Sequence, residues 1–455
     1  MSQLPRYESY KDSGVQWLGE IPSHWKLIKN KFIFKFSKGL TITKENLIDE
    51  GMPCVSYGEV HSKYGFEVDP LKHDLKGVPE IYLETDPNAL LKKGDFIFAD
   101  TSEDIKGSGN FTYLNSDVPT FAGYHTVTAK MSICNNPRYL AYVFESDAHR
   151  NQVRTLIKGV KVFSITQAIL KNTFVWLPSL DEQKIIADFL DKRLAQVDAL
   201  IAKQETLLEK LAEQRVALIS HAVTKGLNPD ADFIMSKNAW LGEIPKDWIL
   251  KPTKYFLSYV GSGKTPKGGA EVYIDEGVIM IRSQNVHDEG LRLEDVVHIT
   301  DEADQGQINT RVYEDDVLLN ITGASLGRVS LVPKGIPLAN VNQHVCILRP
   351  IKSLISPQFL HLIMQSHYAK SLIKSEENGT SREGLTFEQI KAMVFALPPI
   401  DEQQTICEKI QSDLEDLNKS KNYCENLIKK LKEYRSTLIT QVVTGKIDVR
   451  NLKVN

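Results

Sequence analysis

A nine-residue motif occurs twice in this chain of 455 residues, and this repetition constrains the fold more than any other feature of the sequence. Trp17–Trp25 reads WLGEIPSHW and Trp240–Trp248 reads WLGEIPKDW, so seven of the nine residues are identical at an offset of 223 positions. A second pair, LPSLDEQKII from Leu177 and LPPIDEQQTI from Leu397, has an offset of 220. Solenoid repeats have periods of roughly 20–50 residues, so this longer period indicates the duplication of one large two-part unit.

Each copy ends in a long segment whose apolar residues recur at alternating spacings of four and three, which is typical of a heptad seam. Ser179 and Glu182 have the spacing of a capping box at the first helix start, and Gly226 and Gly445 predict the two helix ends. About 40 residues at a rise of 1.5 Å give each helix a length of roughly 60 Å. The first seam contains Leu190, Leu194, Val197, Ile201, Gln204, Leu208, Leu211, Arg215, Leu218 and Ala222, and the second contains Ile410, Leu414, Leu417, Lys421, Cys424, Ile428, Leu431, Arg435, Leu438 and Val442.

Matched seams in matched repeats indicate that the two helices pack against each other, although two unrelated core helices remain an alternative. Related copies normally lie about an approximate two-fold axis, which makes the paired helices antiparallel. We then expect a stiff rod with one varied domain at each end and with the chain termini close together. The polar seam residues Gln204 and Lys421 are expected to set the register of the pair rather than to bind a ligand.

The repeats divide the chain into six segments. We expect the varied domains to be mixed α/β or mainly β, because DFIFAD (95–100) and DVLLNI (316–321) have the pattern of buried strands that precede polar loops. The same alignment places His125 opposite His344, while overall identity between the varied domains is low. The segments are an N-terminal conserved segment (1–25), a first varied domain (26–176), a central conserved helix (177–227), a linker with the repeated entry motif (228–248), a second varied domain (249–396) and a C-terminal conserved helix (397–455).

Charge suggests a polyanionic partner only locally, since the net charge of the whole chain is −3. Lys26–Lys44 contains six lysines and no acidic residue, interleaved with three phenylalanines. Ile249–Ala270, at the same place in the second repeat, contains four lysines and again no acid. Such positive surfaces are what contact with nucleic-acid phosphates requires, and a solvated strand face is the equally open alternative.

No catalytic or metal-binding motif stands out. GSGKTP (261–266) resembles a phosphate-binding loop, but Ser258 occupies the position of its first glycine and Pro266 follows where a helix should begin. The five cysteines are scattered, which favours reduced thiols in a cytoplasm-like compartment over zinc or disulfides. No secretory h-region and no apolar run of ~18 residues is present, so we expect a cytoplasmic protein that does not associate with a membrane. We also expect it to bind no metal and no cofactor.

Taken in order, the motifs resemble those of the specificity subunit of a type I restriction–modification system. The resemblance covers essentially the whole chain and rests on both WLGEIPxxW entries, GKTPKGG, TGASLGR, NQH and both LPxxDEQ helix starts. The first varied domain opens with KGLTITKEN and lacks the glycine-threonine-proline motif of the family. The resemblance implies an α+β fold in which two similar α/β target recognition domains are separated by two long antiparallel coiled-coil helices, with a pseudo-two-fold internal repeat.

The resemblance also implies a function. Such a chain is not itself an enzyme: each recognition domain reads one half of a bipartite target in double-stranded DNA. The coiled coil sets the gap between the half-sites and docks two methyltransferase subunits. Restriction subunits with ATP-dependent translocase and endonuclease activity then join the assembly.

On this hypothesis we expect loop residues of both varied domains to contact DNA, although a turn or capping role is equally open for each of them. A protein–protein scaffold with a duplicated coiled coil is the alternative function, and a nucleotide hydrolase that uses Lys264 and Thr265 is a third. The expected DNA contacts are Lys29, Lys31, Lys38, Lys44, Lys106, Ser108, His125, Lys264, Thr265, Lys267, Arg282, Gln284, Asn285, Arg328, Asn342, Gln343, His344 and Arg382.

Overall fold

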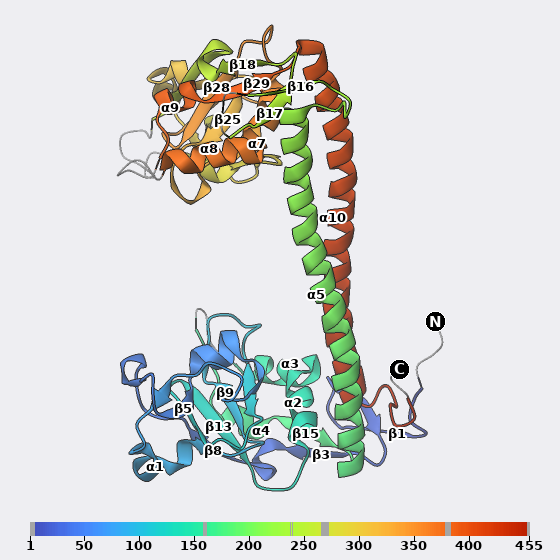
Figure 1. Ribbon diagram of the computed structural model, residues 1–455. Coiled ribbons are helices and arrows are strands. Elements are labelled where there is room, and N and C mark those ends of the chain that lie inside the picture. The colour runs from blue at the N-terminus through green and yellow to red at the C-terminus, as the bar shows by residue number, and fades with distance from the viewer. Residues whose placement is uncertain are drawn as a thin grey trace. The chain divides into compact units, whose positions relative to one another are not determined.

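The computed structural model describes residues 5–157, 162–236, 238, 240–264, 273–377 and 384–452 (Figure 1). The chain forms two compact units. Unit 1 comprises Met1–Gln204 and Asn426–Asn455, and unit 2 comprises Glu205–Glu425. Two long helices are α5 (Leu180–Lys225, 46 residues) and α10 (Ile400–Val443, 44 residues). One part of each helix belongs to unit 1 and the other part belongs to unit 2.

Unit 1 contains two sheets. The five-stranded sheet has the order β4-β13-β9-β11-β6, and the four-stranded sheet has the order β7-β5-β12-β8. The pairing is antiparallel throughout except for β11 with β6 and β12 with β5. The strands are β4 (Phe34–Lys38), β13 (Thr126–Met131), β9 (Phe96–Ala99), β11 (Phe111–Leu114), β6 (Phe66–Val68), β7 (Gly77–Val78), β5 (Met52–Val55), β12 (Thr120–Ala122) and β8 (Leu90–Leu91).

Unit 2 has a closely related topology, with four strands in each of its two larger sheets. Its sheets have the orders β19-β28-β25-β26 and β23-β20-β27-β24, and the pair β20 with β27 is parallel, like β5 with β12. The duplication read from the motifs is therefore present in the strand connections, even where the two sequences have diverged. The strands are β19 (Leu257–Ser262), β28 (Val345–Pro350), β25 (Val317–Asn320), β26 (Val329–Leu331), β23 (Val297–Ile299), β20 (Val278–Ile281), β27 (Ala339–Val341) and β24 (Arg311–Val312).

Three short helices pack on the five-stranded sheet of unit 1 and on the β19-β28-β25-β26 sheet of unit 2, and they recur at an offset of 220 residues. They are α2 (Pro137–Glu145), α3 (Asp147–Leu156) and α4 (Gln167–Asn172) in unit 1, and α7 (Pro357–Gln365), α8 (His367–Glu377) and α9 (Phe387–Ala392) in unit 2. Matching two-stranded pairs are β1 (Tyr10–Asp12) with β2 (Glu20–Pro22), β16 (Phe233–Met235) with β17 (Glu243–Pro245), β3 (Lys26–Lys29) with β15 (Phe174–Leu177), and β18 (Ile249–Pro252) with β29 (Val394–Leu397). The remaining elements are α1 (Tyr82–Thr85), α6 (Asp301–Gln305), β10 (Thr101–Ser102), β14 (Phe163–Ser164), β21 (Val286–His287) and β22 (Gly290–Leu291).

The two long helices pack along the predicted seam within each unit. In unit 1, Leu190 of α5 shares a core with Leu438 of α10, and Arg435 donates a hydrogen bond to Asp198 at 3.1 Å. In unit 2, Arg215 Nη1 lies 3.4 Å from Asn418 Oδ1. The early part of each helix therefore lies against the late part of the other, which confirms the antiparallel prediction and contradicts the alternative of unrelated core helices. Of the predicted seam positions only Lys421 is exposed.

The second tryptophan of each repeated motif is joined to the glutamate of the following DEQ motif. Trp25 is fully buried and its Nε1 donates to Glu182 Oε1 at 3.1 Å. Trp248 Nε1 donates to the Glu402 carboxylate at 3.2 Å in unit 2. In each unit the two motifs therefore form one joint between the varied domain and the start of the long helix.

This joint corrects one sequence prediction. The Ser179 hydroxyl accepts a hydrogen bond from the Glu182 amide at 3.3 Å, so Ser179 caps α5 as expected. The reciprocal half of the capping box is wrong, because the Glu182 carboxylate binds Trp25 and His24 Nε2 instead of the helix backbone. A buried indole N–H needs an acceptor, and tertiary packing places the Glu182 carboxylate within hydrogen-bond distance of the Trp25 indole.

The glutamine of each DEQ motif is buried and links the helix start to the neighbouring short helix. Gln403 Oε1 accepts from the Ser356 amide at 2.9 Å, while its Nε2 donates to Leu354 O at 3.1 Å and Pro398 O at 3.0 Å. Gln183 makes the corresponding bond to the Asn136 amide at 2.9 Å. These bonds satisfy backbone groups at the start of α7 and α2. The same structural role in both units explains why the DEQ motif occurs in both repeats.

Acid is expected to weaken unit 1 through one buried histidine. Burial lowers the pKa of His149 from 6.5 to about 3, so the folded chain keeps this ring neutral where the unfolded chain protonates it. The contribution of His149 is therefore present above its ordinary pKa and is lost as pH falls below it, by about 1.5 kcal/mol between pH ~6.5 and ~5. Denaturant unfolding at the two pH values should show a smaller loss in His149→Gln, whereas His367→Gln, at an exposed histidine, should leave the loss unchanged.

Candidate nucleic-acid interface

Three strand ends meet at one edge of the larger sheet in unit 1. The central strand β13 pairs antiparallel with β4 and β9, and its register places Val127 opposite Lys38 and Thr126 opposite Ala99. The end of β4, the end of β9 and the start of β13 therefore coincide. Lys38, Asp100 and His125 occupy these ends, so the register brings together two residues that we expected to contact DNA and one that we did not.

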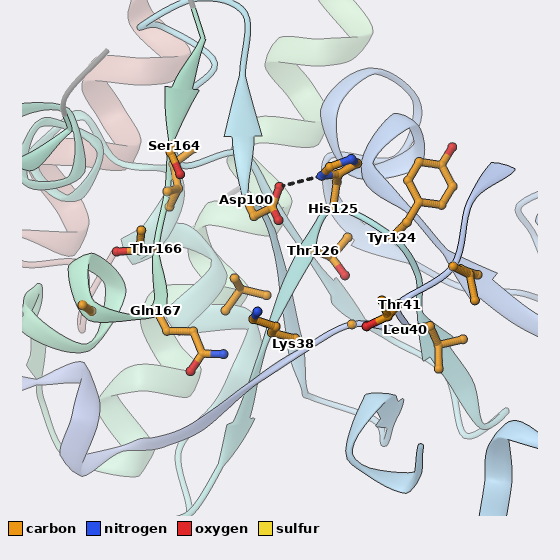
Figure 2. Close-up of a pocket in the computed structure, with 15 residues that line it drawn as sticks. Lys38, Leu40, Thr41, Asp100, Tyr124, His125, Thr126, Ser164, Thr166 and Gln167 are labelled. Atoms are coloured by element: carbon orange, nitrogen blue, oxygen red, sulfur yellow. Dashed lines mark ion pairs between the residues drawn. The ribbon is translucent and has the colours of Figure 1, made fainter. Parts of the chain in front are cut away.

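These residues line a cavity of about 570 Å³ (Figure 2). Thr166 and Gln167, at the start of α4, form its opposite wall. His125 Nδ1 lies 3.4 Å from Asp100 Oδ1. His125 has a φ of +53°, a left-handed conformation that is unusual for a residue with a Cβ and that often marks a functional loop.

The same edge exists in unit 2 with different side chains. The register of β28 places Val345 opposite Asn320, so His344 starts the central strand as His125 does in unit 1. His344 Nδ1 lies 2.6 Å from the Thr322 hydroxyl, and its Nε2 lies 3.2 Å from Gln343 Nε2. The predicted alignment of His125 with His344 is confirmed, because each residue directly precedes the central strand of its own sheet. Asp100 and Thr322 were missed, although Asp100 is the last residue of one predicted buried strand and Thr322 directly follows the other, which is a usable signal.

A glycine follows the first strand of this edge in each unit because backbone atoms fill the space. A Cβ on Gly39 would lie 2.1 Å from Gly123 O, and a Cβ on Gly263 would lie 1.5 Å from Val341 O. Gly263 N–H donates to Asn342 O at 3.2 Å, and Lys264 N–H donates to Gln307 Oε1 at 3.1 Å. Two amides of GSGK that a phosphate-binding loop would direct at its ligand are therefore used within the protein.

Gly263→Ala is expected to destabilise unit 2 by about 1–3 kcal/mol, because the new methyl group would displace the carbonyl of Val341. Denaturant unfolding of the full chain measures this loss. The matched control is Gly58→Ala, since a Cβ at Gly58 has no heavy atom within 4 Å. Equal effects of the two substitutions would contradict the close backbone approach as the reason for this glycine.

The predicted lysines of unit 1 are distributed over several elements. Lys31, Lys38, Lys44 and Lys106 are exposed, and Lys29 is half-buried in β3 beside the Phe174 ring. Of the interleaved phenylalanines, Phe32 is exposed, whereas Phe34 and Phe36 belong to the hydrophobic core and are therefore not available to stack on bases.

Three predicted contacts have structural roles and are withdrawn. Ser108 is buried and its hydroxyl donates to Asp104 O at 3.3 Å. Asn285 is buried and donates to Arg292 O and Asp295 O, both at 3.0 Å, while Asn342 Oδ1 accepts from the His344 amide at 3.1 Å. These side chains hold turns, which the sequence analysis left open as an alternative.

The side chains of the other predicted residues of unit 2 differ in their exposure to solvent. Gln284, Arg328 and Gln343 are exposed, and Arg282 is half-buried over the Tyr273 ring at 5.9 Å. Lys264 is exposed at the end of the same sheet edge as His344. Thr265, Lys267 and Arg382 lie outside the described residues.

Other site chemistries find little support in the described part of the chain. No group of three or more histidine, cysteine or acidic residues there could hold a metal ion. All five cysteines are unpaired, as the sequence predicted. Among the helices of the described residues, none is both long and apolar enough to cross a membrane.

The chain is similar to proteins of restriction systems over most of its length. A family model described as "Type I restriction modification DNA specificity domain" matches residues 22–210 and again 245–430. The type I restriction enzyme EcoBI specificity subunit of Escherichia coli is 27% identical over 297 residues, an alignment that covers 64% of this chain and only 61% of that protein. The EcoKI specificity subunit of Escherichia coli K12 is 20% identical over 444 residues, covering 94% of this chain and 90% of that one.

A solved structure from work on complex assembly and conformational transition of the type I R-M system has a TM-score of 0.66 at 15% identity. It covers 93% of this chain and 98% of its own. At this level of identity the likeness shows the fold alone, and it agrees with the duplicated topology of the two units.

Proposed function

The chain belongs to the type I restriction–modification specificity family, and from this premise we propose that each unit reads one half of a bipartite target in double-stranded DNA. The observation that carries this proposal is a sheet edge that occurs once in each unit. The strand register at this edge matches in both units, but side chains at equivalent positions differ: Lys38 and Asp100 of unit 1 correspond to Ser262 and Ile321 of unit 2. A duplicated scaffold with divergent loops suits the reading of two different half-sites.

The proposed contacts divide into two groups. Lysines of the first group bind phosphates and position the units, whereas side chains of the second group donate to or accept from base edges. The first group contains Lys29, Lys31, Lys44, Lys106, Lys264 and Lys267, and the second contains Lys38, Thr265, Arg282, Gln284, Arg328, Gln343, His344 and Arg382, with His125 as a positioning residue.

We further propose that the chain is non-catalytic and supplies recognition to partner subunits. Two methyltransferase subunits dock on it, restriction subunits join them, and the paired long helices set the gap between the half-sites. The antiparallel packing of α5 against α10 within each unit supports this division of labour. The internal use of the GSGK amides argues against nucleotide hydrolysis by this chain.

Methylome sequencing of cells with and without the intact gene tests the proposal. We expect one split methylation motif, with two defined half-sites and an unread gap, that disappears when the chain is deleted. An identical methylome in both strains, with the partner subunits expressed, would refute it. Purified chain with its methyltransferase partners should also bind target duplex in a salt-dependent way, with a loss on the order of 10³-fold between about 50 and 200 mM salt for about six phosphate contacts.

The same binding experiment separates this function from the protein–protein scaffold. A scaffold predicts no duplex affinity that depends on salt and no difference between target and scrambled duplex. A complex that binds both duplexes equally would favour a non-specific DNA-binding role over recognition of a sequence.

A further inference from the structure

We propose that Asp100 and Lys38 together read one G·C base pair of the half-site bound by unit 1, an inference that rests on the proposed function. The cytosine would donate from its N4 amino group to the Asp100 carboxylate, and the guanine would accept from the Lys38 ammonium at O6 or N7. His125, whose Nδ1 lies 3.4 Å from Asp100 Oδ1, is a positioning residue beside the carboxylate.

The first step is that Asp100 is held in place by its backbone. Its N–H donates to His125 O at 3.1 Å, and its carbonyl accepts from the Ile165 amide at 2.7 Å. The residue is therefore attached to the start of β13 on one side and to the segment before α4 on the other. A side chain on so constrained a backbone is preorganised, which is what reading a base edge requires.

The second step concerns the two carboxylate oxygens. Asp100 Oδ1 is buried and accepts no hydrogen bond within the described part of the chain, and His125 Nδ1 lies 3.4 Å from it. The Asp100 side chain is still 34% exposed. Figure 2 shows the carboxylate facing the imidazole at the rim of the cavity that Lys38 also lines. His125 thus sits beside one oxygen, and the other is available to a ligand.

The third step is electrostatic. A carboxylate at a DNA-facing edge is repelled by the phosphates and weakens binding unless a base donates to it. In the major groove only the amino groups of cytosine N4 and adenine N6 are donors, and aspartate is suited to cytosine. A lysine that lines the same cavity matches the two acceptors of guanine, so the pair of charges is complementary to G·C.

Unit 2 provides an internal contrast. At its equivalent edge the neighbour of His344 is the Thr322 hydroxyl, at 2.6 Å, and not a carboxylate. A hydroxyl can both donate and accept, so it does not select an amino group. The inference therefore applies to the half-site of unit 1 only.

The test is a methylome comparison in cells that carry the whole system with Asp100→Asn on the chromosome. The unit 1 half-site is first identified as the one that changes when residues 26–176 are exchanged. We expect the native half-site to contain a G·C pair whose discrimination falls about 5- to 150-fold in Asp100→Asn. The rest of that half-site and the whole second half-site should stay unchanged. The matched control is Asp117→Asn, since Asp117 is exposed and paired only at the surface with Lys93 at 2.9 Å, and it should leave the motif intact.

Two results would overturn the inference: an unchanged motif in Asp100→Asn, or a uniform change in methylation at all positions. Lys38→Gln, at an exposed side chain, provides a second test if Asp100→Asn proves unstable. A change at the same base pair supports the inference, and a change at none overturns it. If the native chain directs no split motif, the proposed function itself fails; if a split motif is present but insensitive to both variants, only this inference fails.

Discussion

Inserting four residues into each long helix is expected to abolish methylation of the native target and to create a new target whose unread gap is longer by about 1–2 base pairs. Four residues add ~6 Å of helix, and DNA rises ~3.4 Å per base pair along its axis. Because the loops that we propose to read bases are untouched, both half-sites should keep their sequences. Methylome sequencing of the variant strain gives the gap directly.

The structure indicates where such insertions should go. The contacts of Asp198 with Arg435 and of Arg215 with Asn418 follow one antiparallel register, so positions after Gln204 in α5 and after Ile428 in α10 lie opposite each other. An insertion in α5 alone is the control, because it shifts one seam against the other and should reduce stability without defining a new gap. A changed half-site, or a new motif with the original gap, would contradict the proposal that the helices set the gap between the half-sites.

Trp25→Ala is expected to destabilise unit 1 by about 3–5 kcal/mol, the usual cost of removing a large buried aromatic side chain. Trp25 is 0% exposed, and its Nε1 hydrogen bond at 3.1 Å is one of the bonds to the buried carboxylate of Glu182. Its indole also lies 3.3 Å from the position that a Cβ on Gly445 would take, so the cavity opens beside the end of α10. Hydrogen exchange of peptides from unit 1 measures the loss locally.

The first tryptophan of the same motif provides the control. Trp17 is 41% exposed and touches Trp176 at a ring distance of 6.1 Å, so Trp17→Ala should cost much less stability. Equal losses for both variants would mean that the motif acts as one structural block. A large loss for Trp25→Ala only would show that the second tryptophan carries the joint.

Much of the architecture was predictable because it repeats. The offset of 220 residues located α5 and α10, their seam and their glycine ends, and Gly226 and Gly445 indeed have φ values of +75° and +71°. Periodicity and glycine conformation are local properties of a chain, so they can be read without a fold. The alignment of His125 with His344 succeeded for the same reason, since both precede the same duplicated strand.

The candidate site was predicted only in part. Ser108 and Asn285 have residue types that suit base reading, but burial and bonds to turn carbonyls occupy them. Asp100 was missed because its importance comes from a neighbour 25 residues away in the chain, across the register of β9 and β13. A polar residue in a loop has the same appearance in sequence whether it caps a turn or faces a ligand.

The sequence by itself determined that the chain is a duplicated unit with a long, seam-bearing helix in each copy, because repetition and periodicity are written in residue order. Only the tertiary structure decided what the repeated motifs do. Glu182 appeared to be a capping residue and proved to be the partner of Trp25, since a buried indole N–H must find an acceptor. Strand register likewise decided which loop residues meet at one edge, because it joins positions that residue order keeps apart.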